Sequence, residues 1–225
     1  MLNENPKKEK KRKKKDYAHP TKMQLFWRVQ RECWRRMVTP FMMYLFTSLI
    51  AFACQAINQE TTTIVEIILG SVCIAGGAAF NAHLCYHYGI LHYDAYLTGA
   101  LHRKNELFGI PSGGDHHVER EYRPWKGFLI GFFIGVPVLI IAAFVPLIPD
   151  IAGTGLMMFA AWSILPVKWI SNDNSSIWAM VMIALPIIIS GIFYIVGAHV
   201  ERDKKAGESE REEAVKEAGK KARNK

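Results

Sequence analysis

Four long apolar stretches follow one another along the chain, and none contains Asp, Glu, Lys or Arg: residues 37–59, 67–93, 127–149 and 174–200. A helix needs about 20 mainly apolar residues to cross the ~30 Å hydrocarbon core of a bilayer. A soluble helix bundle would interrupt such stretches with charged residues on its wet faces. Since backbone groups in lipid must be satisfied within the segment, helices are favoured. The pattern therefore predicts an all-α, polytopic membrane helix bundle with four transmembrane helices.

A fifth charge-free stretch, residues 151–167, is shorter and contains two glycines and Pro166. Segments of this length are typical of re-entrant or interfacial elements. Trp162 and Trp169 suit a helix at the outer boundary of the membrane. We therefore predict a short outer re-entrant or interfacial segment between the third and fourth spans. The alternative is a fifth span, which would place the basic C-terminal tail outside.

The 28 Lys and Arg residues lie almost entirely in three parts of the chain: 13 within residues 1–37, five within residues 88–126 and nine after residue 200. Short loops rich in Lys and Arg remain on the cytoplasmic side of a membrane. Four alternating spans place all three parts on that side. We therefore expect a multi-pass plasma-membrane protein with cytoplasmic N- and C-termini.

The same pattern divides the chain into parts. Residues 1–22 are a basic N-terminal tail, which we expect to be disordered because its cations repel one another and bury little apolar surface. Residues 23–37 alternate aromatic residues with arginines, which predicts an amphipathic helix lying on the inner leaflet. Residues 38–200 hold the transmembrane bundle with its cytoplasmic loop 88–126, and residues 201–225 form a charged cytoplasmic tail.

The basic segments before the first span predict binding to anionic lipids of the inner leaflet, at about 1 kcal/mol per cation near the surface. We expect no specific nucleic-acid partner, although the basic run also resembles a nuclear-localisation or RNA-binding patch. The predicted lipid-binding residues are Lys7, Lys8, Lys10, Lys11, Arg12, Lys13, Lys14, Lys15, Arg28, Arg31, Arg35 and Arg36.

Six of the eight histidines lie between residues 83 and 117. On a helix, His83, His87 and Asp94 share one stripe, and converging imidazole and carboxylate groups suit a transition metal. A proton relay or an anion site would use the same groups. The alternative is an aromatic belt at the membrane boundary, since tyrosines alternate with the histidines. The predicted metal ligands are His83, His87, Asp94, His116, His117 and His199.

The second span is rich in small residues, which let helices pack closely in lipid: Gly70, Ala75, Gly76, Gly77, Ala78, Ala79 and Ala82. The sequence contains no complete catalytic or pump motif, and no acid lies in the middle of a predicted span, which argues against a carrier built on a buried carboxylate.

We therefore expect a subunit or accessory of a membrane assembly or transporter, with other membrane proteins or further copies of the chain as partners. One alternative is a histidine-rich membrane metalloenzyme or metal transporter with its site at the cytoplasmic face. Another is an anionic-lipid-binding scaffold. A transition metal is the only cofactor that the residues suggest.

Overall fold

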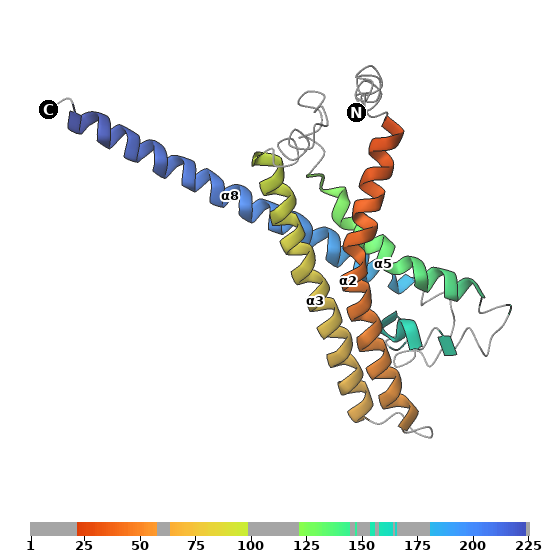
Figure 1. The fold of residues 1–225 in the computed structure, drawn as a ribbon. Helices are drawn as coiled ribbons and strands as arrows, with labels where there is room; N and C mark the ends of the chain where they lie inside the picture. The colour runs from red at the N-terminus through yellow and green to blue at the C-terminus, as the bar shows by residue number, and fades with distance from the viewer. Residues whose placement is uncertain are drawn as a thin grey trace, which may run out of the picture.

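A computed structural model of the chain describes residues 22–57, 64–98, 122–144, 147, 154–155, 158–163, 165 and 181–223 (Figure 1). The long helices are α2 (Lys22–Ile57), α3 (Ile64–Thr98), α5 (Trp125–Phe144) and α8 (Ala184–Arg223). Each contains a segment long and apolar enough to cross a membrane. The prediction of an all-α, multi-pass membrane bundle with four spans is confirmed within the described residues.

Helices α2 and α3 form an antiparallel pair, and the second pair, α5 and α8, packs against it (Figure 1). Helix α8 contacts both α3 and α5, and its charged C-terminal half extends away from the bundle. Between α5 and α8 the described residues form short helical pieces, at residues 154–155, 158–163, 165 and 181–182, and turns at residues 147 and 183. Trp162, which we expected at the membrane boundary, is only 2% exposed, and its ring packs 5.1 Å from that of Tyr44.

Helix α2 runs unbroken through the boundary that we expected at residues 37–38. Its buried positions recur every three or four residues, so that one face packs on the bundle from the basic segment onward. Pro40 lies inside the helix and is itself fully buried, and packing of this kind allows a membrane helix to tolerate proline. The buried face consists of Cys33, Met37, Pro40, Tyr44, Thr47, Ser48 and Ala51.

Glycines bring α8 close to its neighbours. On α5, Gly127, Gly131 and Gly135 repeat every four residues, and a Cβ on any of them would collide with α8 or a side chain of the residues just before it. On the other side, a Cβ on Gly89 of α3 would overlap the carbonyl oxygen of Tyr194, and one on Gly197 would overlap that of Tyr86. This repeat is the small-residue packing typical of membrane helices, and it fixes the two helix contacts from which the site is built.

Candidate functional site

Each long helix contributes one polar side chain to a cluster inside the bundle: Glu32 from α2, His92 from α3, Lys126 from α5 and Tyr194 from α8. Lys126 is 1% exposed and His92 is 6% exposed, while the side chain of Glu32 keeps 35% of its surface. Charged side chains buried within span-length helices are costly and commonly functional. We call these four residues the ion cluster.

The carboxylate of Glu32 lies between two nitrogen-bearing side chains. Lys126 Nζ donates a hydrogen bond to Oε2 at 3.1 Å. His92 Nε2 lies 2.9 Å from Oε1, so the two form an ion pair only when the imidazole is protonated, and the contact does not reach hydrogen-bond geometry. Burying the ammonium group of Lys126 is favourable only when it meets a partner at close range, and the carboxylate of Glu32 supplies one.

The other ring nitrogen of His92 extends the cluster to α8. Nδ1 lies 2.7 Å from the hydroxyl of Tyr194, and the tautomer of the ring decides which of the two donates the proton. The ring of Tyr194 is stacked on that of Tyr122, at 5.8 Å between centroids and 9° between planes. A chain of contacts therefore leads from Lys126 through Glu32, His92 and Tyr194 to Tyr122.

The start of α5 positions Lys126 and Tyr194. The backbone N–H of Lys126 donates to the carbonyl of Arg123 at 3.0 Å, which fixes the first turn of the helix. Gly127 follows directly, and its missing side chain lets Tyr194 approach. Lys126 is thereby held against the interior, whereas Arg123 stays exposed.

A second polar contact ties α3 to α8 one to two turns from the ion cluster along α8. Asn81 Nδ2 donates to Ser190 Oγ at 2.9 Å, and the thiol of Cys85 donates to Asn81 Oδ1 at 3.4 Å. On α2, the hydroxyls of Tyr44 and Ser48 are buried without a hydrogen-bond partner among the described residues. Buried polar groups are therefore also present on α2, α3 and α8 beyond the ion cluster.

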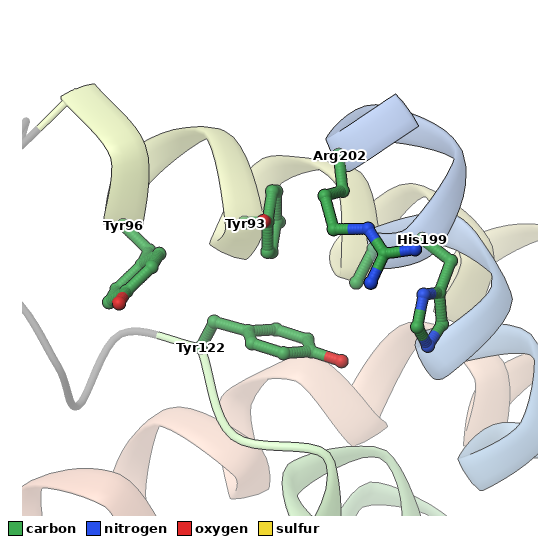
Figure 2. Close-up of a pocket in the computed structure, with 6 residues that line it drawn as sticks. Tyr93, Tyr96, Tyr122, His199 and Arg202 are labelled. Atoms are coloured by element: carbon green, nitrogen blue, oxygen red, sulfur yellow. The ribbon is translucent and has the colours of Figure 1, made fainter. Parts of the chain in front are cut away.

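A pocket of about 330 Å³ opens between α3 and α8, beside the ion cluster (Figure 2). The ring of Tyr122 lies across one side of it, Tyr93 and Tyr96 project from α3, and His199 and Arg202 project from α8. Partial burial raises the pKa of Tyr122 above its usual value, an effect that nearby Tyr93 reinforces and Arg202 opposes. At neutral pH the phenol is therefore a hydrogen-bond donor.

The structure does not bring three of the predicted metal ligands that it describes into one group. His83 and His87 both face outward from α3, with their rings edge to face at 4.5 Å. The carboxylate of Asp94 lies 3.7 Å from Lys205 Nζ on α8, and His199 lines the pocket. Among the described residues, no three His, Cys, Asp or Glu side chains are grouped so as to hold a metal ion. The two remaining predicted ligands, His116 and His117, lie outside the described residues.

Of the predicted lipid-binding residues, the structure describes only the arginines of α2. Arg31 and Arg35 are exposed on α2, and the guanidinium of Arg36 lies 4.8 Å from the centre of the Tyr88 ring. Arg28 belongs to α2. The run from Lys7 to Lys15 lies outside the described residues: Lys7, Lys8, Lys10, Lys11, Arg12, Lys13, Lys14 and Lys15.

Sequence reasoning missed the ion cluster, because it assigned Glu32 to a helix on the membrane surface and Lys126 to the loop. One signal was available. The spacing of Gly127, Gly131 and Gly135 predicts a face that packs closely against another helix, and Lys126 adjoins the first of these glycines.

Comparison with protein families, curated proteins and solved structures gave no match. The function is therefore inferred from the residues of the chain itself.

Proposed function

We propose that the chain is a subunit or accessory protein of a membrane assembly, and that it docks through the outward face of α3. The observation that carries the proposal is the exposure of five residues that share this face: Val72, Gly76, Ala79, His83 and His87. They are separated by three or four residues along the helix, so they form one stripe.

The stripe has two features that favour contact with another helix over contact with lipid. Gly76 has nothing within 4 Å of the place where a Cβ would be, so a second helix can approach its backbone. His83 and His87 follow on the same face, and imidazoles exposed within a span are costly unless a neighbour hydrogen-bonds them. A transmembrane helix of another membrane protein, with small residues and a hydrogen-bonding side chain, satisfies both.

A substitution at Gly76 tests the docking face without disturbing the fold. Gly76→Leu adds bulk where the chain has open space, and Ala143→Leu adds similar bulk at another exposed small residue, on α5. We expect the wild type and Ala143→Leu to migrate in native membranes as a complex larger than the 25.5 kDa chain, and Gly76→Leu to lose it. A wild-type protein that is monomeric in native lipid, or equal behaviour of the two variants, refutes the proposal. A complex of identical chains would replace the foreign partner by a second copy.

The proposal places the chain in the plasma membrane with both termini and loop 88–126 in the cytoplasm. It is supported by the four candidate spans, an even number, and by the crowding of cations into the segments assigned to that side. A protease-sensitive tag after Lys225 should resist protease added to intact cells and be cleaved once the cells are opened. Cleavage of the tag in intact cells would show that the C-terminus lies outside and would contradict the proposed orientation.

An anionic-lipid scaffold is a second candidate, favoured by a groove of about 590 Å³ between α2 and α5. Aromatic side chains from both helices line it, among them Trp34 and Phe133 with ring centroids 5.4 Å apart, and Arg31 also lines it. An acyl chain fits the rings, and a lipid phosphate fits the guanidinium. Arg31→Gln should weaken binding to phosphatidylserine vesicles more than Arg211→Gln on the distal part of α8, and high salt should abolish wild-type binding. Equal binding of the two variants would exclude this role for the groove.

A further inference from the structure

We propose that the pocket between α3 and α8 binds the phosphate group of an anionic ligand. Its lining combines three tyrosines, Tyr93, Tyr96 and Tyr122, with His199 and Arg202. Among the described residues that line it, none carries a carboxylate. This inference does not depend on the docking face of α3, which involves other residues.

The charge of the lining selects an anion. A guanidinium is always protonated and presents a planar set of donors that matches phosphate oxygens. Tyrosine rings alone would suit an ammonium group, but Arg202 among them would repel it. Figure 2 shows the guanidinium directed into the space between Tyr93 and His199.

Two of the described acids near the pocket are engaged by Lys205, which does not line it. Asp94 and Glu201 lie within 3.7 and 3.9 Å of Lys205 Nζ. Asp203 meets Arg202 only at Nε, at 3.1 Å, and both side chains are largely exposed, so the pair is weak. The two terminal nitrogens of Arg202 therefore remain able to donate to a ligand.

The phenols supply further donors and a flat apolar surface. Because the pKa of Tyr122 is raised, its hydroxyl keeps its proton and can donate to a phosphate oxygen. Tyr93 and Tyr122 meet edge to face at 5.3 Å, which leaves ring surface for an apolar group beside the phosphate. The ligand class is thus a phosphate attached to an apolar or aromatic group, either a soluble phosphate monoester or a lipid head group.

The position of the pocket suits a ligand that acts on the bundle. Tyr122 stacks on Tyr194, whose hydroxyl lies 2.7 Å from His92 in the ion cluster. A phosphate held by Tyr122 would therefore lie next to Tyr194, the residue that α8 contributes to the ion cluster.

Two probes distinguish the two sources of phosphate. Full-length protein in phosphatidylcholine nanodiscs is titrated with phenyl phosphate by calorimetry. In a second arm the nanodiscs contain phosphatidic acid, and the thermal midpoint is compared with that in phosphatidylcholine alone. Binding of phenyl phosphate identifies a soluble ligand, stabilisation by phosphatidic acid alone identifies a lipid head group, and either result supports the site provided that it depends on Arg202.

The dependence is tested with Arg202→Gln and a matched control, Lys204→Gln, which removes one exposed cation from the same helix. Hydrogen bonds to a charged group contribute about 1.5 to 3 kcal/mol, so Arg202→Gln should weaken binding by about ten- to a hundredfold. Lys204→Gln should change it by less than about threefold, as expected for a screened surface charge. The proposal is overturned if the wild type binds neither probe, if the two variants weaken binding equally, or if phenyltrimethylammonium binds in place of phenyl phosphate.

Discussion

Replacing Glu32 by Gln removes the carboxylate shared by Lys126 and His92, and the structure predicts how large the effect will be. Removing one member of a buried ion pair costs about 3–5 kcal/mol, whereas an exposed pair contributes about 0–1 kcal/mol. The Lys126 side chain is 2% exposed, so its ammonium group loses its carboxylate in a place with little access to water. We therefore expect Glu32→Gln to lower the free energy of unfolding by about 3 kcal/mol.

The reverse change should cost less. In Lys126→Met the apolar stem is kept, and the remaining carboxylate of Glu32 is 35% exposed and still faces His92. Because water screens that charge, we expect a loss of about 1–2 kcal/mol. In the double variant no charge is left from the pair, so the combined loss should be smaller than the sum of the two single losses.

Thermal unfolding of the protein in nanodiscs measures these differences. For a chain of this size about 3 °C corresponds to 1 kcal/mol, so the expected shifts are about 9 °C for Glu32→Gln and about 3–6 °C for Lys126→Met. Glu212→Gln is the control, because its ion pair with Lys216 is 3.9 Å long and exposed on both sides, and it should shift the midpoint by less than about 2 °C. Equal shifts for the two single variants would refute the difference in burial between Glu32 and Lys126. Strict additivity in the double variant would refute the interaction between them.

Three further predictions concern other parts of the bundle. Gly89→Ala should lower the thermal midpoint by several degrees, about 1–3 kcal/mol of overpacking against α8, whereas Gly76→Ala should leave it nearly unchanged. Because burial raises the pKa of Tyr122, the unfolded chain loses the phenol proton at a lower pH than the folded chain. The free energy of unfolding should therefore fall above about pH 10, and less steeply in Tyr122→Phe. Denaturant titrations at neutral and alkaline pH measure the difference. If the metal hypothesis holds, zinc, iron or manganese should copurify with the wild type and be lost in His87→Ala by elemental analysis; equal metal content in both would remove His87 from the ligand set.

The helices could be predicted from the sequence because charge-free length alone decides whether a segment can cross a membrane. The orientation of a helix around its own axis could not, because it depends on which neighbour each face meets. On α3, His92 follows His83 by nine residues, which is about 180° of rotation at 100° per residue. The two histidines therefore face opposite directions. The sequence drew attention to the outward pair, His83 and His87, and the structure buries His92.

The surroundings of Asp94 could not be predicted for a related reason. Its place on the stripe with His83 follows from the helical repeat, but its ionic partner is Lys205, more than a hundred residues further along the chain. Lys126 was likewise predicted to lie in the loop, but it is buried and pairs with Glu32, which lies 94 positions before it. Long-range pairs of this kind depend on how the helices pack, and only the glycine repeat on α5 could have indicated that packing in advance.

The ion cluster and the glycines depend on each other. Close backbone approach at Gly89, Gly127 and Gly197 leaves little room for water beside His92 and Lys126, so the charge of Lys126 and the ring nitrogens of His92 each need a partner within the protein. A rotation of any one helix would withdraw a member of the cluster and leave a buried charge less well paired. We therefore expect the cluster to penalise alternative packings of the four helices more than it stabilises the native one. It follows that a variant lacking both Glu32 and Lys126 should unfold over a broader temperature range than wild type, even where its midpoint is largely restored.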